Sequence, residues 1–149
     1  MEDRYLFRGK RIDNGEWVDG HLVADELNPQ NYFIAYVYGT DEDKQPHDLD
    51  VAMIDKNTIC QCTGLRDKNG KLIWENDLVK YPFSDTIAPI RYGSYRSCFD
   101  SIKTEHVGFY VDWSVTDKEY TRKDLGYWIN MIDAKIVGNI FDNPELLEV

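Results

Sequence analysis

The chain has no apolar run long enough to cross a membrane, and its first residues do not combine positive charge with an apolar segment. A membrane span and a secretory signal are therefore not expected. Only three cysteines are present, Cys60, Cys62 and Cys98, and this odd number forms no disulfide framework. Such cysteine usage is typical of a reducing compartment, so we expect a soluble cytoplasmic protein.

Basic residues are also scarce, because 17 Lys and Arg stand against 27 Asp and Glu, for a formal net charge of -10. A strongly acidic surface repels phosphates, so nucleic acid binding through a broad basic face is disfavoured. The charge favours solubility first, and it also suits a basic protein partner. Exposed strand edges and abundant tyrosine would also suit association with a second copy of the chain.

Motifs of catalysis and metal binding are missing as well. The chain contains no C-x-x-C pair, no H-x-x-x-H spacing and no G-x-S-x-G element. We therefore predict no catalytic, cofactor-binding or metal-ligating residue, and no enzymatic activity. One alternative stays open, since catalytic groups can assemble from distant positions. Its candidate residues are Glu75, Asp77, His106 and Asp112.

The sequence does contain short runs of aromatic and β-branched residues separated by turn residues. Ten Tyr, six Phe and four Trp give an aromatic content of 13%, and such side chains favour strands. No long helical period and no internal repeat is present, so the predicted fold class is mainly β with little helix. A small barrel, or a barrel-like pair of sheets, would bury such strands without leaving open edges.

Two Asn-Gly dipeptides mark predicted hairpin turns, one in "FRGKRIDNGEWVDGHL" and one in "TGLRDKNGKLIW". The aspartate at the start of "DKNG" supplies a further turn residue, and the one in "END" is expected to accept backbone hydrogen bonds at the entrance of the next strand. A catalytic acid–base pair in "END" is the alternative. The residues assigned a structural turn role are Asn14, Gly15, Asp67, Asn69, Gly70 and Asp77.

Further elements follow from the same pattern. The run "NYFIAYVYG" predicts a buried strand that ends at Gly39. The acidic "TDEDKQPHDLD" contains Pro46 and lacks periodicity, which predicts an exposed loop. Strands are also predicted in "TICQCTG", "ENDLVKY", "HVGFYVDWSV" and "AKIVGNIFDN", whereas "DLGYWINMID" is ambiguous and "PELLEV" allows one helical turn.

A small basic cluster near the N-terminus raises a nucleic-acid alternative. It consists of Arg4, Arg8, Lys10 and Arg11, beside the aromatic residues Tyr5, Phe7 and Trp17. Interleaved basic and aromatic side chains can hold single-stranded nucleic acid by stacking and phosphate pairing. Nearby carboxylates oppose this, and we favour neutralisation of the cluster by Asp3, Asp13, Glu16 and Asp19.

Three blocks, "FRGKRIDNGEWVDGHL", "TGLRDKNGKLIWENDLVKY" and "IVGNIFDNPELL", resemble the YopX family of bacteriophages and prophages of Gram-positive bacteria. The resemblance implies a largely β protein with an SH3-like barrel part and a phage origin. It implies no activity, and no catalytic residue can be carried over. Family members often have Gly where Asn76 stands, and we expect the turn to survive because Asn tolerates left-handed backbone angles. Cys60 and Cys62 also depart from the family pattern, which affects local packing.

Together these observations predict an N-terminal β region over residues 1–63 and a C-terminal SH3-like barrel region over residues 64–149, or one compact unit that includes both. The predicted role is that of a phage accessory protein in the host cytoplasm, acting by protein–protein binding or self-assembly. An enzyme with a scattered site and a small-barrel nucleic-acid module are the alternatives.

Overall fold

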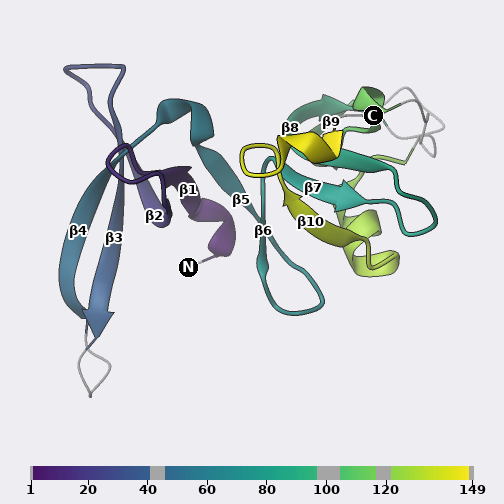
Figure 1. Ribbon diagram of the computed structural model, residues 1–149, viewed down its shortest axis with the longest axis horizontal. Helices are drawn as coiled ribbons and strands as arrows, with labels where there is room; N and C mark the ends of the chain where they lie inside the picture. The colour runs from purple at the N-terminus through teal and green to yellow at the C-terminus, as the bar shows by residue number, and fades with distance from the viewer. Residues whose placement is uncertain (1, 41–45, 97–104, 117–121, 148–149) are drawn as a thin grey trace. The chain divides into compact units, whose positions relative to one another are not determined.

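The chain divides into two compact units, Met1–Cys62 and Thr63–Val149. The structure is a computed structural model that describes residues 2–40, 46–96, 105–116 and 122–147 (Figure 1). Its fold is mainly β, with antiparallel strands in two sheets, as the composition predicts. Among the described residues, no helix is long and apolar enough to cross a membrane.

The first unit is an antiparallel sheet with the strand order β4-β3-β2-β1-β5. Its elements are η1 (Asp3–Tyr5), β1 (Phe7–Lys10), β2 (Trp17–Ala24), β3 (Tyr32–Thr40), β4 (Pro46–Ile54), η2 (Lys56–Thr58) and β5 (Cys60–Arg66), the last of which continues into the second unit. The predicted first hairpin is confirmed, because β1 pairs with β2 from Phe7–Gly20 to Lys10–Trp17. In Figure 1, β3 and β4 form the long hairpin.

The loop prediction for "TDEDKQPHDLD" is wrong from Pro46 onward. Pro46–Ile54 is strand β4, which pairs with β3 residue by residue from Tyr32–Ile54 to Val37–Leu49 and beyond. A proline is tolerated here because it is the first residue of an edge strand. The pairing with β3 supplies the β-structure that local composition does not predict. Residues 41–45 of the predicted loop lie outside the described residues.

The core of the first unit lies on one face of this sheet. Ile34, Ala52 and Ile54 are buried there, and Val18, Leu22, Tyr36 and Ile59 pack against them. The close approach of strands depends on glycine, since a Cβ on Gly20 would lie 2.3 Å from the carbonyl oxygen of Ala35. Only the face of this strand that carries Ile34 is buried. The prediction of a buried strand for "NYFIAYVYG" is right for that face only.

The second unit contains a four-stranded antiparallel sheet with the order β10-β7-β8-β9, and a hairpin of β5 and β6. Its further elements are β6 (Leu72–Trp74), β7 (Asp77–Lys80), β8 (Ile87–Tyr95), β9 (His106–Val111), η3 (Trp113–Val115), η4 (Tyr127–Met131), β10 (Lys135–Asn139) and η5 (Pro144–Leu147). The pairing of β10 with β7 has a register shift between Ile136 and Gly138. Such a shift bends a strand and increases its twist.

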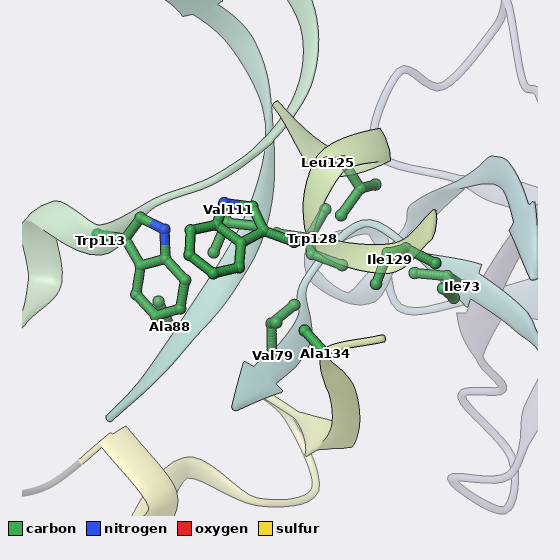
Figure 2. Packing of buried hydrophobic residues seen from close by; sticks show 10 residues of the cluster. Ile73, Val79, Ala88, Val111, Trp113, Leu125, Trp128, Ile129 and Ala134 are labelled. Atoms are coloured by element: carbon green, nitrogen blue, oxygen red, sulfur yellow. The ribbon is translucent and has the colours of Figure 1, made fainter. Parts of the chain in front are cut away.

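Aromatic side chains fill the core of the second unit. Trp113 and Trp128 lie close together in this core (Figure 2). Their ring centroids are 5.1 Å apart and the ring planes meet at 67°. Tyr81 meets both rings edge-on, at 6.1 and 5.6 Å. The remaining buried members of this cluster are Ile73, Val79, Ala88, Ile90, Val111, Leu125, Ile129 and Ala134. This edge-to-face arrangement adds a directional attraction to the burial of apolar surface.

Two segments form short helices, which resolves the ambiguity of one and confirms the single helical turn predicted for the other. The ambiguous "DLGYWINMID" contains the short π-helix η4, and "PELLEV" contains the 3₁₀-helix η5. Strand β8 has no counterpart among the predicted elements, because Pro89 stands inside it and proline argues against a central strand. The Pro89 carbonyl still accepts a hydrogen bond from the backbone N–H of Asp112, at 2.9 Å.

Candidate functional site

The first Asn-Gly pair lies in the loop between β1 and β2. Arg11 N–H donates to the Glu16 carbonyl and Gly15 N–H donates to the Arg11 carbonyl, both at 2.9 Å. Gly15 has φ of +73°, and the Asn14 side chain accepts a bond from Glu16 N–H at 2.9 Å. The glycine therefore supplies the left-handed backbone, whereas the asparagine closes the loop with its side chain.

The second Asn-Gly pair also places its glycine in left-handed backbone, but an aspartate closes this turn. Asp67 accepts from the backbone N–H groups of Asn69 and Lys71, both at 2.9 Å. Gly70 N–H donates to the Asp67 carbonyl, and Gly70 has φ of +82°. Each bond joins neighbours along the chain, so this segment is a hairpin turn held by one aspartate and one glycine.

The "END" segment is a third turn, and its Asp77 holds a backbone N–H. Asp77 is buried, at 5% exposure, and its Oδ2 accepts a hydrogen bond from Trp74 N–H at 2.9 Å. Asn76 has φ of +71°, which confirms that asparagine takes the left-handed position here. Asn76 Oδ1 also accepts a bond from Arg91 at 2.7 Å. These contacts order the entrance to β7.

The other residues of the scattered enzyme hypothesis lie at opposite ends of one strand. His106 begins β9 and stacks on Tyr95 with centroids 5.3 Å apart. Asp112 follows the last residue of β9 and accepts a bond from Ser114 N–H at 3.2 Å. At about 3.3 Å per residue, six residues of strand separate the two by about 20 Å. The structure does not bring this pair together.

The cysteines give no ligand cluster in the described part of the chain. Cys60 and Cys62 are buried, and Cys60 Sγ donates to the Thr58 carbonyl at 3.2 Å. Cys98 lies outside the described residues. Across residues 2–40, 46–96, 105–116 and 122–147, no three His, Cys, Asp or Glu side chains are grouped as a metal site would require.

The basic cluster of the N-terminal hairpin is occupied by local contacts. Arg4 pairs with Glu2 at 2.5 Å, and Arg11 pairs with Asp13 at 2.8 Å. The hydrogen bonds from Arg11 lower the pKa of the Asp13 carboxyl below its ordinary value. Two further cations, Arg8 and Lys10, lie over the Trp17 ring at 4.4 and 5.3 Å from its centroid. The basic side chains of this cluster therefore contact residues that are near them in the chain or across the same hairpin.

A cavity of about 250 Å³ lies in the second unit, beside the Asp67 turn. Its wall includes Asn69, Ile129 and residues 133–136. Both turn bonds of the Asp67 carboxylate go to Oδ1, so this oxygen is committed to the turn.

The face of the first sheet opposite its core is apolar and exposed. Its large side chains are Val23, Phe33, Val37, Leu49, Val51 and Met53, which we call the apolar hairpin face. Five of these residues, all except Phe33, are between 40% and 70% exposed. The pairs Val23–Phe33, Phe33–Met53 and Val37–Leu49 stand directly opposite one another in the ladders, so the set is contiguous. Exposed contiguous apolar surface of this kind marks interaction sites.

Sequence reasoning did not find this face. The run over β3 is apolar on both faces, so its pattern predicts complete burial, and no strand was predicted for β4. A usable signal was present in "DLDV", where Asp48, Leu49, Asp50 and Val51 alternate at the period of a strand. Only the pairing with β3 shows that the apolar members face outward together.

Comparison with known proteins identifies a relationship over almost the whole chain. A family model described as YopX protein matches residues 6–148. No curated protein matches the chain.

Proposed function

Because the chain belongs to the YopX family, we propose that it is a phage or prophage accessory protein of the host cytoplasm, and that it works by protein–protein contact rather than catalysis. The apolar hairpin face is the observation that carries this proposal. It presents large apolar side chains on three adjacent strands, and their removal from water would drive association.

The charge of the first unit favours a basic protein as the partner. Residues 1–62 contain thirteen Asp and Glu and six Lys and Arg, so this unit carries seven excess negative charges. Complementary charge speeds association and selects among partners, whereas the apolar contact supplies most of the affinity. Association of this kind weakens as salt rises.

We also propose that the second unit is an SH3-like barrel. Four antiparallel strands, one with a register shift, and a single aromatic core support it. In the described residues the sheet is open, because the ladders leave β9 and β10 at its two ends. An experimental structure that places β5 and β6 across this core would support the assignment, and one with the sheet open along its length would refute it.

The test of the binding function is capture of partners from phage-infected host cells with the tagged full-length protein. We would compare the wild type with the double variant Val37→Ser, Leu49→Ser, which makes the apolar hairpin face polar. The matched control is Val107→Ser, Val115→Ser, because these two exposed apolar residues, 71% and 47% exposed, lie in the second unit.

We expect a defined protein to be recovered with the wild type and the control, and to be lost or strongly reduced with the hairpin-face variant. The mass of each protein in solution would be measured in parallel, since self-assembly through the same face would lower the mass of the hairpin-face variant alone. Equal recovery and equal mass for all three proteins would contradict the proposal.

A further inference from the structure

We propose that the outer edge of β4 accepts an extended basic segment of the partner protein as an additional antiparallel strand. This inference rests on the proposed binding function and specifies the chemistry of the partner. The partner segment would alternate apolar with Lys or Arg side chains. Addition of a strand to an open edge uses backbone hydrogen bonds for affinity and alternate side chains for specificity.

One end of the β4 edge is closed and the rest is open. Ile12 N–H donates to the Met53 carbonyl at 3.1 Å, and Asp55 N–H donates to the Lys10 carbonyl at 2.8 Å. In an antiparallel ladder, alternate residues direct their backbone groups to the same side. Val51 and Leu49 therefore direct theirs to the side that Met53 uses. In the described part of the first unit β4 is the last strand of its sheet, so no strand pairs with them there.

The edge N–H of Val51 is held by a carboxylate that a partner could replace. Asp50 Oδ1 accepts this N–H at 2.8 Å, and Asp50 Oδ2 accepts a bond from the Tyr36 hydroxyl at 3.3 Å. Both side chains of the Asp50–Val51 pair are exposed. A partner carbonyl that bonds Val51 N–H would release Asp50, whose charge would then be met by a cation of the partner.

Side chains along β4 define what the added strand must carry. Leu49 and Val51 point to the apolar hairpin face, whereas Asp48 and Asp50 alternate with them and point to the other side. Residues opposite one another in a ladder stabilise it when they are both apolar or carry opposite charges. A strand that alternates apolar and basic residues satisfies both sides, and its apolar residues would extend the apolar hairpin face.

A second copy of this chain fits the edge less well. Residues that stand opposite one another in an antiparallel pair lie on the same face of the sheet. If two β4 strands paired about a two-fold axis, each even-numbered residue would therefore stand opposite an even-numbered residue of the other copy. Asp50 would then lie directly or diagonally across from Asp48 or Asp50 of the other copy. Like charges at these positions destabilise pairing, and the seven excess negative charges of residues 1–62 add to the repulsion.

The experiment titrates full-length protein against a fluorescent peptide of alternating valine and lysine. A peptide of the same composition, with valines and lysines in two separate blocks, controls for simple charge attraction. The key variant is Val51→Pro, which removes the edge N–H but none of the bonds between β4 and β3. Val51→Thr is its matched control, because threonine keeps both the N–H and the branched shape.

We expect Val51→Pro to weaken binding of the alternating peptide by at least about tenfold, and Val51→Thr to weaken it by less than about threefold. Amide hydrogen exchange of β3 reports whether the sheet is retained in each variant. A second variant, Asp50→Lys, leaves the backbone unchanged. It should reverse the preference, so that a peptide of alternating valine and glutamate binds better than the valine–lysine peptide.

Several outcomes would overturn the inference. Equal binding of the block peptide would assign the attraction to charge alone, and a concentration-dependent dimer lost in Val51→Pro would assign the edge to a second copy. If Val37→Ser, Leu49→Ser abolishes partner capture while Val51→Pro leaves both capture and peptide binding unchanged, the proposed function stands and the edge inference fails. If neither variant changes capture, both fail.

Discussion

At the residue scale, five of the described aspartates hold backbone N–H groups in turns. Asp55 accepts from Asn57 N–H at 3.0 Å, and Asp25 accepts from Leu27 N–H at 2.9 Å. Asp67, Asp77 and Asp112 do the same in the second unit. An ionised carboxylate makes a stronger bond to a backbone N–H than a neutral acceptor does. Part of the acidity of the chain is therefore structural.

The buried Asp77 provides the residue-scale prediction. Asp77→Ala leaves Trp74 N–H without its acceptor, and we expect the free energy of unfolding to fall by about 1–3 kcal/mol. Asp77→Asn keeps a side-chain oxygen as acceptor and should cost less than Asp77→Ala. Urea unfolding followed by tryptophan fluorescence would measure both. Equal stability of Asp77→Ala and the wild type would show that this contact does not hold the turn.

At the element scale, the hairpins are determined by their turns. In the β5–β6 hairpin only Gly70 of the Asn-Gly pair has a positive φ, since Asn69 is not among the residues with left-handed backbone. The β1–β2 hairpin shows the same division between Asn14 and Gly15. Left-handed backbone costs a residue with a side chain roughly 1–2 kcal/mol. The glycine of each pair is consequently the residue that the turn requires.

Gly70→Val should lower the free energy of unfolding by about 1–2 kcal/mol or more, because valine is strained at φ of +82°. Asn69→Val is the control, and its effect should be smaller since Asn69 contributes its N–H to Asp67, which valine retains. The double variant should resemble Gly70→Val. Thermal unfolding of the three proteins would test this order, and a loss that is larger for Asn69→Val would contradict it.

At the scale of the whole molecule, the two units have separate hydrophobic cores. One is centred on Ile34 and Ile54, and the other on Trp113, Trp128 and the strands around them. The sequence places the boundary between residues 63 and 64, and the two compact units of the structure divide between Cys62 and Thr63. Each core would support its own cooperative transition if the units fold as domains.

Ile34→Ala and Ile90→Ala test this independence, since both side chains are fully buried, one in each core. Each change should cost about 2–4 kcal/mol through lost burial and a cavity. We expect hydrogen exchange to accelerate only in the unit that carries the change. Acceleration in both units from either variant would instead show one cooperative unit.

The sequence alone determined the β class, the turns and the family relationship. Local chemistry suffices for these features, because Asn-Gly pairs, aspartates and Pro144 act within a few residues of their own position. The central block around Asp67 and Gly70 illustrates this, since each bond that closes the turn joins residues at most four apart.

Tertiary structure alone decided which apolar residues are buried. Ile34 and Val37 belong to one apolar run, yet Ile34 is buried and Val37 is 57% exposed. Likewise, the strand character of residues 46–50 depends on pairing with β3. A side chain's burial depends on which face of a strand receives a second layer, and that layer is contributed by residues distant in sequence. The apolar hairpin face and the open edge of β4 follow from this packing, since the alternation in "DLDV" does not tell which face of the strand is covered.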